Sequence, residues 1–217
     1  MTVAIEVQMA PSALRWRQLW LCSLAVLAAA MPVVASPLPL QAAPALVVLL
    51  RHGHKDRPAE SAVEPNYNLS ATGFAQALQL AKLVPACLQQ GRRLRLISYG
   101  FDPQSGKNAR SYQTLVPLAV TSGVNIRLMQ GAANDSEAIG RQLRDDHSLD
   151  GAVVVIAWEH RRLPLLAKGL GWSEMTPVDE GDFDSLWLLR YPAASGTPTV
   201  EVRSQQGLQS QGCRRNR

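Results

Sequence analysis

The chain has 217 residues, of which 47% are hydrophobic and 18% are charged. This balance is that of a globular protein with one domain and a sizeable core, and it excludes a disordered or fibrous chain. The formal net charge is +5, yet no basic stripe interleaved with aromatic residues is present, so a nucleic-acid partner is not expected.

The N-terminus has the layout of a secretory signal peptide, because Arg15 and Arg17 precede an apolar run that ends in small residues. We therefore expect a leader at 1–35, a spacer at 36–44, one domain at 45–205 and a basic tail at 206–217. The expected location is periplasmic or extracellular, with no stable membrane insertion once the leader is removed. An uncleaved leader that anchors the protein in the membrane is the alternative.

The rest of the chain alternates strand and helix patterns. Short apolar runs predict strands at 45–50, 94–99, 124–129, 152–157 and 183–191, and an edge strand at 199–203. Helical spacing predicts helices at 71–84, 109–122, 135–144 and 162–169. Ser70 is the expected N-cap of the first helix, and Pro85 and Gly91 are expected to close it. This alternation predicts an α/β fold with a mostly parallel sheet and helices on both faces.

Two of the predicted strands end in segments that carry histidine. The first strand runs into Arg51-His52-Gly53-His54, and the strand at 152–157 runs into Trp158-Glu159-His160. Because ligands bind beyond the carboxyl ends of parallel strands, we expect His52 and His160 at one edge of the sheet. A neutral imidazole is a competent nucleophile, and a guanidinium matches phosphate oxygens, so this edge favours phosphoryl chemistry.

Arg110 falls in the first turn of the predicted helix 109–122. The dipole of a helix disfavours a cation at this end and favours an anion. A phosphate group that binds both the guanidinium and the free backbone N–H groups would explain an arginine there.

Four segments, in this order, resemble the histidine phosphatase (phosphoglycerate-mutase-like) superfamily. They are Arg51-His52-Gly53, the stretch from Asn68 to Ala77, the stretch from Ala109 to Thr114, and His160 after a buried strand. The resemblance covers about Leu46 to Leu170 and is greatest to small bacterial members with a Trp-Glu-His segment. It implies a three-layer α/β/α sandwich.

The resemblance also implies the chemistry. His52 would form a transient phosphohistidine, and Arg51, Arg110 and His160 would bind the phosphate, without a metal ion or a cofactor. Arg57 would be a further phosphate ligand, with Lys55 as its rival for that position.

The proton donor remains open, because Arg161 stands where the acid-phosphatase branch has an aspartate. Glu159 is preferred, and Glu137 and Asp135 are the alternatives.

The expected function is that of a phosphomonoesterase acting on a small phosphorylated molecule or a phosphoprotein. One alternative is a phosphate- or phosphoprotein-binding module with little catalytic activity. The other is a phosphotransferase or mutase with the same nucleophile.

The two cysteines beyond the leader are Cys87 and Cys213. An oxidising compartment would permit a disulfide between them, but their spacing does not show that their Cα atoms approach. The interpretation favoured by the sequence is one buried thiol and one thiol in the tail.

Overall fold

The computed structural model describes residues 43–56, 66–129, 135–192, 197–210 and 213. The predicted leader and Arg57 lie outside these residues. Among the described residues, six strands form one sheet in the order β3-β2-β4-β1-β5-β6. The strands are β1 (Leu46–Arg51), β2 (Leu94–Tyr99), β3 (Ile126–Met129), β4 (Val153–Trp158), β5 (Ser185–Arg190) and β6 (Thr199–Ser204).

The sheet is mostly parallel, as predicted. β1 and β2 both pair in parallel with β4, and β3 pairs in parallel with β2. β5 and β6 continue the sheet in antiparallel fashion on the other side of β1. β1 and β4 are therefore central, and every residue of both is buried, as expected for strands covered on both faces.

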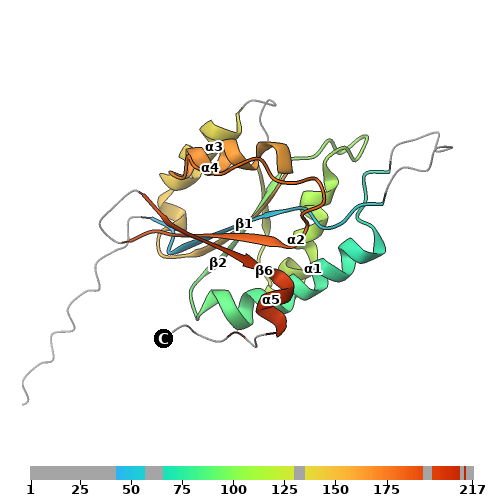
Figure 1. Ribbon diagram of the computed structural model, residues 1–217, viewed down its shortest axis with the longest axis horizontal. Coiled ribbons are helices and arrows are strands. Elements are labelled where there is room, and N and C mark those ends of the chain that lie inside the picture. The colour runs from blue at the N-terminus through green and yellow to red at the C-terminus, as the bar shows by residue number, and fades with distance from the viewer. Residues whose placement is uncertain (1–42, 57–65, 130–134, 193–196, 211–212, 214–217) are drawn as a thin grey trace, which may run out of the picture. The chain divides into compact units, whose positions relative to one another are not determined.

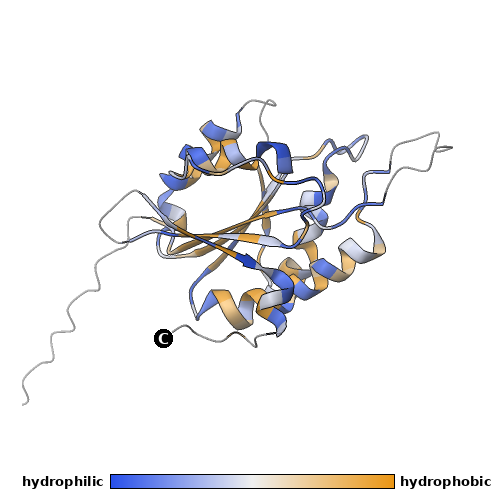
Figure 2. Ribbon diagram, viewed as in Figure 1, coloured by the Kyte–Doolittle hydropathy of each residue, from blue (hydrophilic) through white to orange (hydrophobic). Residues whose placement is uncertain are grey.

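Helices cover both faces of the sheet (Figure 1). α3 (Ser136–Arg144) and α4 (Leu163–Gly169) pack on one face, where Ile139, Leu143 and Leu166 meet apolar strand residues. α1 (Ala71–Leu83) and α2 (Ala109–Ser122) pack on the other. Figure 2 shows that hydrophobic residues concentrate in the strands between these two layers. The predicted three-layer sandwich is thus confirmed, with a core on each side of the sheet.

Helical structure continues past Pro85, which was expected to close the helix predicted at 71–84. α1 stops at Leu83, but the chain continues as a π-helical segment, η1 (Val84–Gln89). Pro85 lies in the first turn of η1 and has no backbone N–H to donate, so the α-helical hydrogen-bond pattern is interrupted where α1 passes into η1. Helical structure ends at Gln90 and Gly91, which both adopt positive φ angles. Ser70 is the N-cap, as predicted, and its side chain accepts a hydrogen bond from the backbone of Gly73.

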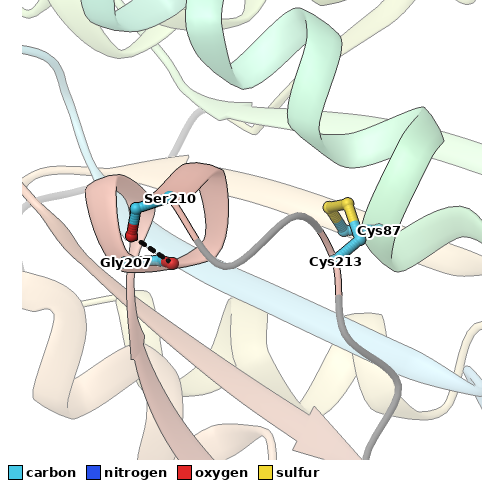
Figure 3. The surroundings of a disulfide bond; sticks show 4 residues. All are labelled: Cys87, Gly207, Ser210 and Cys213. Atoms are coloured by element: carbon cyan, nitrogen blue, oxygen red, sulfur yellow. Dashed lines mark hydrogen bonds between the residues drawn. A yellow bond between two sulfur atoms is a disulfide. The ribbon is translucent and has the colours of Figure 1, made fainter.

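The interpretation of the two cysteines as free thiols is wrong. Figure 3 shows Cys87 of η1 bonded to Cys213, and their Cα atoms lie 5.0 Å apart. Between β6 and Cys213 the chain forms α5 (Gln205–Ser210), which packs near α1. This helix brings the tail back over the sheet face that η1 covers, an approach that sequence spacing does not reveal.

Two short 3₁₀ segments complete the fold, η2 (His147–Leu149) and η3 (His160–Arg162). No helix within the described ranges has the length and apolar character to cross a bilayer.

Candidate active site

The two histidines meet at one edge of the sheet. Arg51 at the end of β1 pairs with Trp158 at the end of β4, so His52 and His160 leave neighbouring parallel strands side by side. Their ring centroids lie 6.4 Å apart, with an angle of 87° between the ring planes. The expected placement of His52 and His160 is thereby confirmed.

His52 has a defined tautomer. Its Nδ1 lies 2.8 Å from the carbonyl oxygen of Gly53. Because a carbonyl oxygen only accepts, Nδ1 carries the proton, and Nε2 keeps its lone pair. Burial lowers the pKa of His52 to about 4, and the charges of Arg51 and Arg110 act in the same direction. The ring is therefore neutral at pH 7, which is the state a nucleophile requires.

The stretch after the nucleophile is fixed by the segment that begins α1. The backbone N–H of His54 donates to Oε1 of Gln76 at 2.9 Å, and its carbonyl accepts from the backbone and hydroxyl of Ser70. A Cβ on Gly73 would lie 2.2 Å from the carbonyl oxygen of His54. Gly73 thus permits a close approach that any side chain would prevent, and this part of the family-like motif shapes the backbone behind His52.

α2 supports the same stretch from the other side. The hydroxyl of Thr114 accepts from the N–H of Gly53 at 2.8 Å and donates to the carbonyl of Arg110 at 2.7 Å. The side chain of Gln113 binds the backbone of Leu69 and the side chain of Asn68. These two residues of α2 therefore brace the loops around His52, while Arg110 lines the cavity beside them.

Arg110 is held by the loop that precedes α1. Its Nε donates to the carbonyl of Asn68 at 2.9 Å, and Nη2 donates to the carbonyl of Asn66. Burial lowers the pKa of Arg110, but a guanidinium remains charged at neutral pH. Nε and Nη2 thus hold the Arg110 side chain in place, and its positive charge helps to lower the pKa of His52.

Arg51 is anchored from the far end of the chain. Its Nη1 donates to the carbonyls of Asp179, Glu180 and Asp182, at 3.0, 2.6 and 3.2 Å. Its Nε and Nη2 are buried and find no hydrogen-bond partner among the described residues. Arg51 is not one of the residues that line the cavity described below. Two buried donors without partners are costly unless an anion binds them.

His160 is the second imidazole, and it is buried. Oε1 of Glu159 lies 3.0 Å from its Nδ1. The contact lacks hydrogen-bond geometry, since within the described part of the chain both ring nitrogens are without a hydrogen-bond partner. Burial and the charge of Arg51 lower the pKa of His160, and Glu159 opposes them. The other oxygen of Glu159 lies 3.6 Å from Nε of Arg162.

These side chains surround a cavity of about 160 Å³. Its walls include the predicted residues His52, Arg110, Glu159 and His160. Lys55, the rival of Arg57, also lines it; Arg57 itself lies outside the described residues. Asn108, Ser111 and Arg161 complete the lining, and sequence reasoning did not select them for it. Asn108 and Ser111 flank Arg110 at the start of α2, so the same motif could have indicated them.

The fold has counterparts among solved structures, although no protein-family model and no curated protein sequence matches this chain. A protein assigned as phosphohistidine phosphatase SixA from Agrobacterium tumefaciens superposes with a TM-score of 0.50 at 17% identity, covering 74% of this chain and 98% of that one. The chain has the histidine phosphatase fold.

Two further structures superpose over a similar share. The protein histidine phosphatase SixA in complex with tungstate gives a TM-score of 0.47 at 16% identity, covering 75% of this chain and 99% of that one. A phosphoglycerate mutase from Bacillus anthracis gives 0.48 at 10% identity, covering 78% and 97%.

On this histidine phosphatase fold, the three candidate acids lie in different places. Glu159 lines the cavity. Glu137 binds Arg141 at 2.6 Å and Lys168 at 3.0 Å, at the contact between α3 and α4. Asp135 is the exposed residue before α3 and is not part of the described lining. Of the three, only Glu159 is placed where it could reach a leaving group in this cavity.

The arrangement is suited to a tetrahedral anion. No group of three or more metal-ligating side chains occurs in the described ranges. What converges instead is a neutral imidazole, a second imidazole and at least one fixed guanidinium. That combination can bind a tetrahedral anion and present a nitrogen nucleophile to its central atom.

Proposed function

We propose that this protein is a phosphomonoesterase that works through a phosphohistidine on His52. The observation that carries the proposal is the buried His52 ring, whose Nδ1 is committed to Gly53 and whose neutral Nε2 is left beside a cavity lined by Arg110 and His160. A nucleophile of this kind needs no further base, because it attacks in the protonation state it already has.

The reaction has two steps. Nε2 of His52 forms a bond to phosphorus while the bond from phosphorus to the ester oxygen breaks, and that oxygen leaves as an alcohol after taking up a proton. Water then attacks the phosphohistidine, the nitrogen–phosphorus bond breaks, and inorganic phosphate and neutral His52 are regenerated. Arg110 and His160, which line the cavity, would bind the phosphoryl oxygens and stabilise the charge that develops on them. Arg51 does not line the cavity, but its Nε and Nη2, which have no partner among the described residues, would be further donors to the bound phosphate.

Glu159 is the proposed proton donor. A proton donor must reach the ester oxygen of the bound substrate, and Glu159 is the candidate acid that lines the cavity with His52 and His160.

The second candidate function is a phosphate- or phosphoprotein-binding module with little catalytic activity. One observation favours it: both carboxylate oxygens of Glu159 already lie against neighbouring side chains, one 3.0 Å from Nδ1 of His160 and the other 3.6 Å from Nε of Arg162, whereas a general acid must be free to reach the leaving group. A phosphotransferase or mutase is the third, but the leader pattern speaks against a role among cytoplasmic metabolites.

We also propose that the protein is exported. The leader pattern at 1–35 is the first support. The disulfide between Cys87 and Cys213 is the second, because such bonds persist in oxidising compartments and are rare in the cytosol. Retention of an uncleaved leader as a membrane anchor is the alternative outcome, and the N-terminal sequence of the mature protein would distinguish the two.

The test is hydrolysis of an activated aryl phosphate and of an alkyl phosphate by the purified protein. Wild-type protein should release phosphate from both, and His52→Ala should abolish both while the protein remains folded. The matched control is His147→Ala, because His147 is exposed and pairs with Asp150 away from the cavity. Turnover by His52→Ala would refute the proposal, and turnover of the aryl ester alone would indicate that the acid is missing.

A further inference from the structure

The side chains of the Arg51-His52-Gly53-His54 motif share one aromatic neighbour. The guanidinium carbon of Arg51 lies 3.9 Å from the centroid of the Phe183 ring. The same ring lies 4.9 Å from the ring of His54 and 6.0 Å from that of His52, measured between centroids. Phe183 comes from the segment before β5, far along the chain, and no family-like motif includes it.

The four residues before Phe183 reinforce this contact. The backbone carbonyls of Asp179, Glu180 and Asp182 take up Nη1 of Arg51. Their geometry is itself fixed, since the carboxylate of Asp179 accepts from Gly181 and that of Asp182 accepts from the backbone of Asp184 and Ser185. Segment 179–183 therefore accepts hydrogen bonds from Nη1 of Arg51 and packs the Phe183 ring against one face of the guanidinium.

The contacts with segment 179–183 leave two nitrogens of the Arg51 guanidinium without a hydrogen-bond partner among the described residues. The fork of Arg51 is fixed through Nη1 and through its face, while Nε and Nη2 stay buried and unpartnered within the described part of the chain. A planar fork held in this way presents two donors in a set direction, which lowers the entropy lost when an anion binds.

We propose that Phe183 is a positioning residue that orients Arg51 for the phosphoryl group and shields His52 from water. This proposal rests on the proposed function of His52. The first role follows from the stacked guanidinium, because the face of an aromatic ring attracts a cation. The second follows from the closeness of the ring to both His52 and His54, because it occupies space beside them that water would otherwise take.

Two substitutions separate the roles. Phe183→Leu keeps an apolar side chain but removes the aromatic face, so it should disturb Arg51 and leave His52 dry. Phe183→Ala removes both. Phe183→Tyr should preserve both the contact with Arg51 and the shielding of His52. Phe74→Leu is the control, because Phe74 lies on α1 and is 52% exposed.

The first measurement is the affinity for inorganic phosphate by calorimetry. Phe183→Leu should weaken binding by about three- to tenfold. In an Arg51→Lys background the same substitution should cause no further loss, because Phe183 then has no guanidinium to orient. Additive losses, or unchanged binding by Phe183→Leu, would overturn the role in orienting Arg51.

The second measurement is the titration of His52 by NMR in protein without ligand. The groups that act on this ring are Arg51, Arg110 and His160, and Lys55, Glu159 and Arg161 line the same cavity. None of these residues is substituted in the Phe183 variants. Phe183→Ala should raise the pKa of His52 from about 4 towards its ordinary value, because water then reaches the ring. Phe183→Leu should leave it low.

The outcomes distinguish this proposal from the proposed function. A His52 pKa that is the same in wild type and Phe183→Ala overturns the shielding role, whatever the protein hydrolyses. Loss of the Arg51 Nε–H resonance from its ordered position in Phe183→Leu, followed without ligand, supports the orienting role even if no phosphate ester is turned over. Wild-type protein that neither binds nor hydrolyses phosphate would contradict the proposed function alone.

Discussion

The ring of His160 stands edge-on to the ring of His52, with 6.4 Å between their centroids. This relationship depends on the parallel pairing of β1 with β4, which places Arg51 opposite Trp158. The residues that follow the two strands therefore leave the sheet at the same edge, next to each other. A tetrahedral anion attacked by Nε2 of His52 would therefore lie within reach of the second imidazole. The fold thus brings together two histidines that are far apart in the sequence.

Arg110→Ala should lower kcat and raise KM together, with a loss of about 10²-fold in kcat/KM. The reason is that a guanidinium bound to the phosphoryl group serves both the ground state and the transition state. Arg110→Lys should recover only part of the loss, because lysine lacks the planar fork. Steady-state kinetics check this, with Arg127→Ala as control, since Arg127 binds Asp146 on the exposed surface. Unchanged kinetics would show that Arg110 does not contact the substrate.

The activity should persist at acid pH. His52 must be neutral to attack, and its pKa is lowered to about 4, so the acid limb of kcat/KM that belongs to this residue should lie near pH 4 rather than 6.5. A pH–rate profile with a buffer series measures it. An acid limb near pH 6.5 would mean that the ring is more hydrated than its burial indicates.

The same residue makes stability depend on pH. Between about pH 6.5 and pH 4 the unfolded His52 binds a proton that the folded ring rejects, so its contribution is complete above pH 6.5 and is lost as the pH falls towards 4. The loss from His52 is at most about 3 kcal/mol. Urea unfolding of wild type and His52→Asn should show a smaller decline in the variant, and equal declines would refute the assignment to His52.

Glu159→Gln should reduce hydrolysis of an alkyl phosphate by about 10²-fold or more and leave an activated aryl phosphate largely unaffected. An alkoxide needs a proton to leave, whereas an activated phenolate does not. Comparison of the two esters measures the effect, with Glu137→Gln as a matched control, because Glu137 lies at the contact of α3 with α4. Equal losses on both esters would instead assign Glu159 to the orientation of His160.

Cys87→Ser should lower the free energy of unfolding by about 2–5 kcal/mol, since the disulfide closes a loop of 126 residues in the unfolded chain. Cys213→Ser and the double variant should lose the same amount. The kinetics should hardly change, because η1 precedes β2 and lies towards the opposite end of the strands from His52. Chemical denaturation under non-reducing conditions tests this, and equal stability of wild type and variants would contradict the role of the bond.

Local patterns predicted much of the fold. The bounds of β2 and α2 are those that the apolar spacing of 94–99 and 109–122 indicated. The meeting of His52 with His160 also followed from sequence, because parallel strands align their carboxyl ends.

Features that depend on distant backbone were not predictable. The strand expected at 183–191 starts only at Ser185, which leaves Phe183 free to contact Arg51. The hydrogen bonds from Arg51 to distant backbone carbonyls cannot be read from a sequence motif. The approach of Cys213 to Cys87 cannot be read from one either.

The most direct test of the account is to trap the covalent intermediate. Wild-type protein mixed with an activated aryl phosphate and quenched in base, where phosphohistidine survives, should yield a peptide phosphorylated at His52 when analysed by mass spectrometry. The same peptide from His52→Ala should carry no phosphate. Turnover at full rate without any phosphorylated His52 would contradict the claim that this imidazole is the nucleophile.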